Sequence, residues 1–372
     1  MKHKLLSSLL LLALFLALAP NAVASTAWYV NGVSGSDSNA CTSPITACKT
    51  IGHAISLAAS GDLIKVAAAT YTENLTIAFS LTIAGSGAPR TIIDGGGVGR
   101  VVTISSATAH VTLSAVTIRH SRAKPTGGGI FNSGTLRLIA STVSGNTSFN
   151  VCTSFCGSVG GGITNFTGAT LTISKSTVSG NQAAVPCNIL FNHCGSGGGG
   201  IFNQGSLTVN NSTISGNDAF SGGGVFNGVF SLRLTVNNST IAGNGGGPLG
   251  GIVNSGSTAT LQNSIVANNS LVNCRGTMTS NGYNLSSDGS CNFTNSGDLN
   301  NTDPQLGPLQ NNGGPTQTMA LPSGSPAVDA GNPSGCTDSL GHLLKTDQRG
   351  KPRPDTEDTG GCDMGAYERQ ND

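Results

Sequence analysis

Charged side chains are scarce in this 372-residue chain: only 9% of the residues are Asp, Glu, Lys or Arg, and the formal net charge is +1. Between Gly95 and Ser287 the only acidic residue is Asp218. Hydrolysis of a glycosidic bond usually needs two flanking carboxylates, and calcium-assisted elimination needs several acidic oxygens. The middle of the chain lacks the groups for either reaction. It also lacks the basic stripe of a nucleic-acid-binding protein.

Motifs for cofactors and metals are missing as well. The sequence has no CxxC pair, no Cys/His spacing typical of zinc, no HExxH and no G-x-S-x-G elbow. We therefore expect no cofactor and no metal. Calcium is an alternative only near the C-terminus, where carboxylates gather with basic residues, although the mixed signs favour an ion-paired surface. These carboxylates are Asp329, Asp338, Asp347, Asp355, Glu357, Asp358, Asp363 and Glu368, and the basic residues are Lys345, Arg349, Lys351 and Arg353.

Long apolar runs are confined to the N-terminus. Lys2 and Lys4 precede an apolar run over residues 5–19, and an Ala-Val-Ala sequence ending at Ala24 supplies a small-residue cleavage site. No later run is long enough to cross a membrane. We predict a signal peptide over 1–24 and a secreted, extracellular protein with no transmembrane segment in the mature chain.

Between residues 127 and 269 the chain repeats one phrase five times: a glycine run, an apolar residue, and short strands that end on Asn. The strands are rich in β-branched residues with period-2 alternation, and no apolar stripe of helical spacing occurs. The shortest unit, from Gly198 to Gly222, spans 24 residues. Such a unit cannot bury its own apolar face, so the copies must stack. The sequence therefore predicts an all-β fold, a parallel β-helix solenoid.

Stacked coils would align equivalent residues about 4.8 Å apart. The repeated Asn residues would then form two columns, which we interpret as structural ladders of amide hydrogen bonds. The glycine runs are expected at turns with positive φ and close backbone approach. One column contains Asn132, Asn165, Asn203, Asn227 and Asn254, and the other contains Asn146, Asn181, Asn217, Asn244 and Asn269.

The mature chain divides into three parts. Residues 25–60 are expected to form an N-terminal cap, in which the apolar spacing over 50–60 predicts a short helix that plugs the solenoid. Residues 61–300 are expected to form the coils. Residues 301–372 are expected to form an irregular capping segment at the C-terminus.

All ten cysteines lie in the mature part, and an even number in an exported chain indicates disulfides. Near-neighbour pairing is favoured: 41–48, 152–156, 187–194, 274–291 and 336–362. Pairing between coils is an alternative for the four cysteines in the two long insertions. The ten residues are Cys41, Cys48, Cys152, Cys156, Cys187, Cys194, Cys274, Cys291, Cys336 and Cys362.

The repeats, Gly-Gly-x-Ile followed by a segment ending in Gly-Asn, resemble the polymorphic outer-membrane-protein repeat of right-handed β-helix proteins. The Phe of that family's Phe-x-x-Asn element is replaced here by a β-branched residue. Residues 61–97 resemble the first coils of pectin-lyase-like proteins. Residues 303–368, with GGPTQTMALPSGSPAVDAGN and GGCDMGAYE, resemble the end of the choice-of-anchor Q group of secreted β-helix proteins. The resemblance covers nearly all the mature chain and implies a right-handed parallel β-helix.

Two groups of residues are candidates for glycan contact. Arg119, His120 and Arg122 lie together on the last strand and turn of an early coil, where they would contact an acidic glycan or remain solvated turn charges. Phe131, Phe202 and Phe226 share one coil position. An exposed phenylalanine column would stack on sugar faces, although a buried aromatic stack is favoured.

These observations favour a non-catalytic secreted or cell-surface protein that acts in adhesion or glycan contact. Its partner would be an extracellular polysaccharide or a cell surface, and nucleic acid is not expected. Because many β-helix proteins are polysaccharide lyases or glycoside hydrolases, an enzyme of that kind is one alternative. A structural extracellular spacer is the other.

Overall fold

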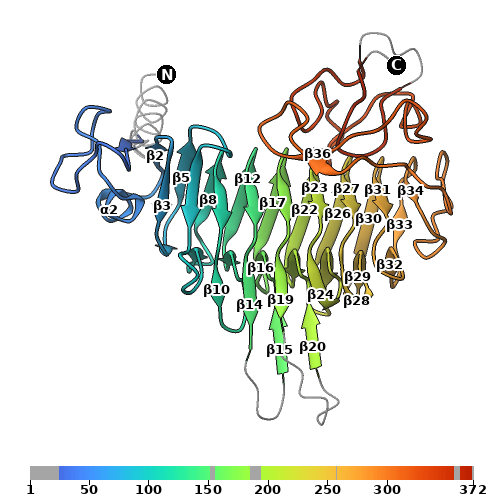
Figure 1. Ribbon diagram of the computed structural model, residues 1–372, viewed down its shortest axis with the longest axis horizontal. Coiled ribbons are helices and arrows are strands. Elements are labelled where there is room, and N and C mark those ends of the chain that lie inside the picture. Colours follow the sequence, from blue (N-terminus) through green and yellow to red (C-terminus); the bar gives the residue numbers. More distant parts are fainter. Residues whose placement is uncertain (1–24, 151–155, 185–193, 257, 356–360, 371–372) are drawn as a thin grey trace, which may run out of the picture.

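The computed structural model describes residues 25–150, 156–184, 194–256, 258–355 and 361–370. The predicted signal peptide, together with Cys152, Cys187, Glu357 and Asp358, lies outside the described residues. Successive coils stack along one axis, with the N-terminal strands at one end and β34 near the other (Figure 1). Long parallel sheets with a single helix in the described part confirm the predicted all-β solenoid.

Two parallel sheets form neighbouring walls of the solenoid. Sheet A contains β1 (Ala27–Val30), β2 (Asp62–Val66), β5 (Leu81–Gly85), β8 (His110–Ser114), β12 (Thr135–Ile139), β17 (Thr170–Ser174), β22 (Ser206–Asn210), β26 (Arg233–Asn237), β30 (Thr258–Gln262) and β33 (Thr279–Ser280). Sheet B contains β3 (Ala69–Thr72), β6 (Thr91–Asp94), β9 (Thr117–Arg119), β13 (Thr142–Ser144), β18 (Thr177–Ser179), β23 (Thr213–Ser215), β27 (Thr240–Ala242), β31 (Ile265–Ala267) and β34 (Leu285–Ser286).

A third sheet completes the coils, and a fourth projects from them, downward in Figure 1. Sheet C contains β4 (Leu75–Ile77), β7 (Val102–Ile104), β11 (Ile130–Asn132), β16 (Ile163–Asn165), β21 (Ile201–Asn203), β25 (Val225–Asn227), β29 (Ile252–Asn254) and β32 (Cys274–Arg275). Sheet D contains β10 (Arg122–Ala123), β14 (Thr147–Phe149), β15 (Cys156–Val159), β19 (Gln182–Ala184), β20 (Cys194–Gly197), β24 (Asp218–Ser221) and β28 (Gly245–Leu249).

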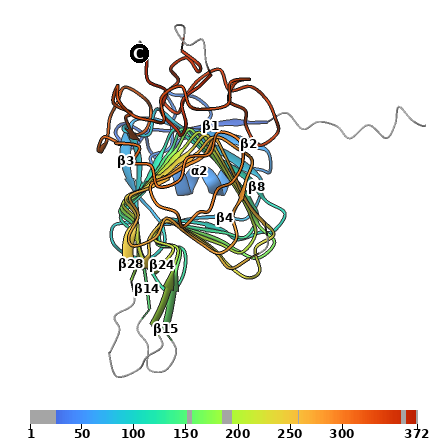
Figure 2. The same ribbon diagram turned by 90° about the vertical axis from the view of Figure 1, so that its right-hand side faces the viewer.

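The helix α2 (Ile51–Leu57) lies at the N-terminal end of the tube, where Figure 2 shows it within the outline of the coils. It buries Ile51, Ala54 and Ile55. The Thr50 side chain caps it at the His53 amide, and the Glu73 carboxylate accepts from the amides of Ile51 and Gly52 at 2.9 and 2.7 Å. These contacts seat the helix against the first coil.

Each of the three positions in a repeated glycine run requires glycine for a different structural reason. Gly160, the first of its run, has φ +64°, and the first glycines of three other runs have similar values. A Cβ on the second, Gly161, would lie 2.3 Å from the backbone of Gln182. A Cβ on the third, Gly162, would lie 3.0 Å from the Asn181 amide group. The runs therefore let the incoming chain pass close beside sheet D.

The repeated Asn side chains form two buried hydrogen-bonded columns. In the first, each Nδ2 donates to the next Oδ1, and in the second the receiving Oδ1 also accepts a backbone amide, as Asn217 does from Asn181. The first column runs Asn132–Asn165–Asn203–Asn227–Asn254 with distances of 2.8, 2.7, 2.7 and 2.8 Å. The second runs Asn146–Asn181–Asn217–Asn244–Asn269 with distances of 3.0, 2.9, 2.9 and 2.9 Å.

The C-terminal residues 301–355 and 361–370, here called the fold-back segment, were expected to form a cap. They instead run back along the outer face of sheet B (Figure 1). Gln348 is buried there against Thr177 and Thr213, and Leu321, Ala327 and Met364 form a second small core with sheet B. The segment contains one short hairpin, β35 (Leu309–Gln310) with β36 (Thr318–Met319).

Three of the predicted disulfides lie within the described residues: Cys41–Cys48, Cys274–Cys291 and Cys336–Cys362. Cys156 and Cys194 occupy equivalent positions of the adjacent strands β15 and β20, but their side chains are outside the described part. The pairing of the four insertion cysteines therefore stays as predicted, with both alternatives. Among the described residues, no helix has the length and hydropathy needed to cross a membrane.

Candidate functional site

The six residues predicted to contact a glycan separate into different places on the surface. Phe131, Phe202 and Phe226 lie on sheet C. Arg119 and His120 lie where β9 leaves sheet B, and Arg122 begins β10 of sheet D. Of the three basic residues grouped by sequence proximity, Arg119 and His120 share one cluster and Arg122 belongs to another.

The three phenylalanines face outward from sheet C. Ile130 and Ile201, which precede two of them, point inward and are fully buried, so strand alternation places the rings outside. The rings are half-buried. The favoured expectation of a buried aromatic stack is therefore wrong, because the interior of each coil is filled by the aliphatic neighbour.

Together with Phe166, the three rings form two pairs. We call these four phenylalanines the aromatic strip. Phe202 and Phe226 stack with centroids 5.5 Å apart and planes at 20°. Phe131 lies 5.5 Å from Phe166, and the Arg100 guanidinium is 4.9 Å from the Phe131 ring centre. Sequence analysis missed Phe166 and Arg100 because neither occupies a repeated column. Phe166 directly follows β16, and Arg100 lies just before β7. Both strands pair with β11, which carries Phe131, so alignment of these strands would have predicted the contacts.

Apolar exposure continues beside the strip. Phe166 is 46% exposed, and the turn after β25 carries Val229 and Phe230, which are 67% and 63% exposed. Single exposed apolar residues are ordinary, but a group of them marks a contact surface. The outward column of sheet C ends at Arg275, which pairs with Val253. With Arg100 at the other end, the strip lies between two cations.

Arg119 and His120 converge on a carboxylate that sequence analysis missed. Asp94 Oδ2 accepts from Arg119 Nε at 2.8 Å, and Asp94 Oδ1 lies 3.0 Å from His120 Nδ1. Asp94 and Arg119 are in register on β6 and β9, one coil apart. With Ser144 and Gly145 they line a surface hollow of about 290 Å³. An alignment of the weakly repeated early coils would have placed Asp94 in register with Arg119 and so predicted this contact.

The electrostatics of the hollow are those of an ion-paired cluster. Burial alone would raise the pKa of Asp94, but hydrogen bonds from the Gly96 amide, Arg119 and His120 outweigh it and hold that pKa below its usual value. Arg119 and His120 keep exposed side chains, at 44% and 64%. The hollow therefore offers one engaged carboxylate, an accessible guanidinium and an accessible imidazole, not the carboxylate pair of a glycosidase.

Arg122 and Lys124 belong to a different contact. Both cations lie over the Phe149 ring of β14, at 4.9 and 5.2 Å from its centre. Arg122 also pairs with Gly99 through an antiparallel bridge. Both basic residues remain exposed to solvent while they lie over this ring.

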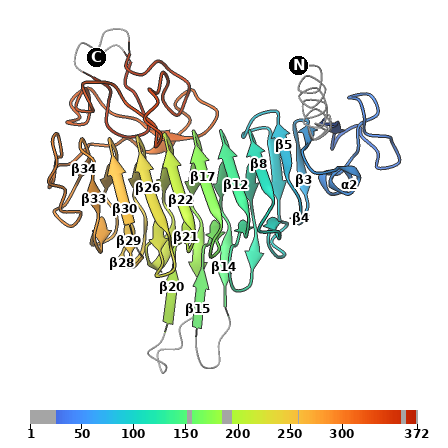
Figure 3. The same cartoon turned by 180° about the vertical axis from the view of Figure 1, so that it is seen from behind.

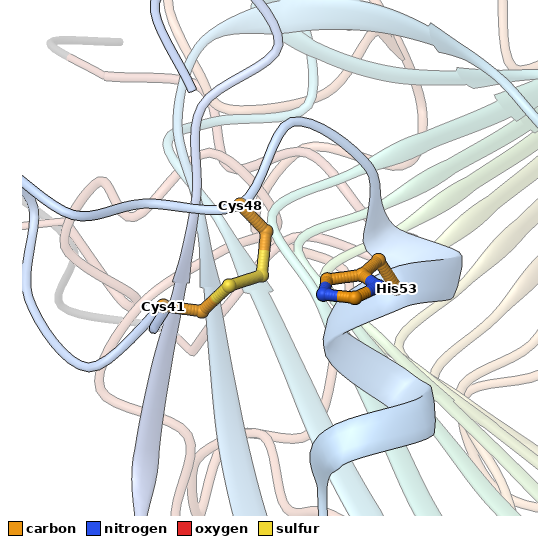
Figure 4. Close-up of side chains that lie close together, drawn as sticks. All are labelled: Cys41, Cys48 and His53. Carbon is orange, nitrogen blue, oxygen red and sulfur yellow. A yellow bond between two sulfur atoms is a disulfide. The ribbon is translucent and has the colours of Figure 1, made fainter. Parts of the chain in front are cut away.

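One group in the described residues has the composition of a metal site: Cys41, Cys48 and His53 (Figure 4). The two sulfur atoms are bonded to each other, so they are not free thiolates. Metal ligation by cysteine requires the thiolate. The oxidised form of this group is a structural disulfide beside a helix.

The carboxylates of the fold-back segment are engaged inside it. Asp347 pairs with Arg349 at 2.7 Å and Glu368 with Arg353 at 2.6 Å, and the Arg353–Glu368 pair is fully buried. Burial is the main reason that the pKa of Glu368 is raised to about 8; Asp363 raises it further, while Arg353 opposes the shift. The expected surface ion pairs are thus partly interior, because this segment packs onto sheet B.

The geometry defines the class of fold before any comparison: parallel sheets wound into one solenoid, with a helix at the N-terminal end. The chain is a right-handed parallel β-helix. Among solved structures it is similar to pectate lyase Pel9A, with a TM-score of 0.57 and 14% sequence identity, covering 94% of this chain and 98% of that one.

Two pectin methylesterases resemble it less. PemA from Erwinia chrysanthemi has a TM-score of 0.37 and 14% identity, covering 82% of this chain and 87% of that one. A pectin methylesterase in complex with a hexasaccharide has a TM-score of 0.32 and 13% identity, covering 88% of this chain and 95% of that one. No family model and no curated protein matches the sequence. At 14% identity, the likeness to the pectate lyase establishes the shared fold alone.

Proposed function

We propose that the protein is a secreted, non-catalytic β-helix that contacts an extracellular polysaccharide through the aromatic strip. The observation that carries the proposal is the outward, half-buried position of Phe131, Phe202 and Phe226, with an arginine at each end of their column. Apolar sugar faces stack on aromatic rings, and the flanking cations favour a chain that carries some negative charge.

The spacing of the strip suits a linear chain that runs along the solenoid axis. Phe131 and Phe202 lie two strands apart on sheet C, which is about 10 Å at the usual strand separation. Such a surface holds an extended polymer without any catalytic group. The resemblance to the choice-of-anchor Q group and to outer-membrane-protein repeats adds an extracellular location and a surface role to the proposal.

A polysaccharide lyase is the second candidate, and the hollow is the observation that favours it. His120 has one ring nitrogen on Asp94, and Arg119 lies beside it, so a base and an anion-binding group are adjacent. The absence of a second carboxylate from the hollow weighs against hydrolysis.

The test measures binding and turnover together. The mature protein is incubated with neutral and uronate-containing polysaccharides, and we expect retention without new unsaturated or reducing ends. Phe202→Ala with Phe226→Ala should weaken retention, whereas Phe220→Ala should not, because Phe220 is an exposed ring on β24, outside the strip. New chain ends would overturn the non-catalytic reading, and equal binding by all variants would overturn the site.

A further inference from the structure

The outer face of sheet A carries a column of threonines that the proposed function does not use. Seven of the eight aligned positions on consecutive strands from β5 to β33 are threonine, and Arg137 on β12 is the exception. Strand pairing holds these positions in register through the whole sheet (Figure 3). The threonines are Thr82, Thr112, Thr172, Thr208, Thr235, Thr260 and Thr279.

The neighbouring outward column is similar in character. Two residues before the main column it presents Thr135, Thr170, Ser206 and Thr258, interrupted by Arg233 on β26. The outward positions of the described strands β5 to β30 include neither a carboxylate nor a Phe, Tyr or Trp ring, and the exposed His110 on β8 supplies their only imidazole. Between Arg137 on β12 and the end of the sheet, the main column therefore presents an unbroken run of hydroxyl and methyl groups, with Arg233 as its charged neighbour on β26.

The fold leaves this face open. The fold-back segment packs on sheet B and reaches sheet A at the ends of its strands, where Asn210 lies 3.4 Å from Ser339. The threonines between β17 and β30 are half-buried by their neighbours in the sheet and keep part of each side chain in solvent. Because threonine is β-branched, the backbone restricts the directions of its hydroxyl and methyl groups.

The two repeats of this array are set by strand geometry. Adjacent strands place equivalent residues about 4.8 Å apart, and alternate residues along a strand are about 6.8 Å apart. In a tetrahedral network of O–H···O bonds about 2.75 Å long, oxygens recur about 4.5 Å apart within a layer and about 7.3 Å apart perpendicular to it. The two spacings of the threonine array therefore differ from the two oxygen spacings of the water network by less than about 10%.

We propose that the outer face of sheet A binds ice. A ligand for the threonine run must be regular in two dimensions and needs no charge, and the ice lattice meets both conditions. A polysaccharide would gain little here, because the face offers no ring on which a sugar can stack. The site is separate from the aromatic strip, so the failure of either proposal leaves the other standing.

The test uses the mature protein and ice alone. We expect it to shape ice crystals, to lower the freezing point below the melting point and to partition into growing ice. Thr208→Lys and Thr235→Lys each place a long charged side chain inside the main-column threonine run from β17 to β33, which is uncharged in the wild type, and should abolish all three effects. Thr142→Lys is the matched control: Thr142 is also a half-buried outward threonine, but it lies on β13 of sheet B.

Circular dichroism and thermal unfolding establish that each variant keeps the fold. Absence of ice shaping and of partition by the folded wild type would overturn the proposal. An equal loss in Thr142→Lys would overturn the assignment to sheet A. Adsorption to crystalline cellulose or chitin that Thr208→Lys abolishes, without any effect of the wild type on ice, would show that a polysaccharide occupies this face and would also overturn the proposal.

Discussion

The coils and the fold-back segment bury polar groups of different kinds. Inside the coils the buried polar side chains of the two ladders are neutral amides, and each one bonds to its own copy in the next coil, as Asn181 does to Asn217. The fold-back segment also buries ionisable side chains, and these contact dissimilar partners, as Arg353 contacts Glu368. In a repeat, the same amide one coil further along supplies the hydrogen-bond partner of a buried amide. In a non-repeating segment, a buried charged group needs a specific residue of opposite charge.

This difference changes how each region should fail. A ladder shares its hydrogen bonds among many equivalent residues, so the loss of one affects its two neighbours. A buried pair of ionisable side chains concentrates its interaction in two residues, and removal of one leaves the other buried without its main partner. We therefore expect the fold-back segment to be the more sensitive region to single substitutions.

The largest effect is expected from Arg353→Met. Arg353 and Glu368 have side chains that are 0% exposed, so the substitution leaves a buried carboxyl without its partner. Breaking such a pair costs about 3–5 kcal/mol. Limited proteolysis should show the fold-back segment cleaved while the coils resist. Arg233→Met, on the exposed face of β26, is the control. Joint unfolding of coils and segment would contradict the separation of the two regions.

The two regions should also respond to pH in opposite directions. The folded pKa of Glu368 is raised to about 8, above its unfolded value, so the folded segment holds a proton that the unfolded chain releases. That stabilisation is complete below the unfolded pKa and is lost as the pH rises towards about 8. In the coils the pKa of Asp94 is lowered, so its contribution is present above the usual aspartate pKa and is lost as the pH falls.

Thermal unfolding measured from about pH 5 to about pH 9 tests this opposite pH dependence of the two regions. The range includes the raised pKa of Glu368, about 8. The transition of the fold-back segment should move to lower temperature as the pH rises, while the coil transition should stay nearly constant. Glu368→Gln should flatten the dependence of the segment, because the side chain no longer titrates. A segment that gains stability towards high pH would contradict the assigned shift.

The repeats made the coil region predictable from sequence. The alternation of Ile130 and Phe131 gives the inward and outward faces directly, and the spacing of the Asn residues gives the ladders. The exposure of the phenylalanines was judged wrongly, because a preference for burying aromatic rings competed with strand alternation and the aliphatic neighbour had already filled the interior.

Contacts outside the repeat could not be read in the same way. Asp94 meets Arg119 through the register of two coils whose sequences repeat only weakly. The fold-back segment carries no period, so nothing in its sequence says that Gln348 lies between Thr177 and Thr213 of sheet B. Such pairings depend on long-range packing, which local pattern does not encode.

The smallest loss of stability is expected from a substitution at the end of an Asn ladder. Comparing it with a substitution inside the same ladder tests whether burial determines the loss. Asn217 lies inside its column: its oxygen accepts from the backbone and side-chain amides of Asn181, and it donates to Asn244. Asn217→Ala removes the acceptor of the Asn181 backbone amide, at about 1–3 kcal/mol for a buried group left unsatisfied, whereas Asn181 Nδ2 keeps its bond to Val143 O and Asn244 Oδ1 keeps its bond from the backbone amide of residue 217. Asn269 is half-buried near the end of the same column, where water can replace part of the lost bonding. Asn269→Ala should therefore cost less in chemical denaturation, and equal losses at both positions would show that the column does not act through burial.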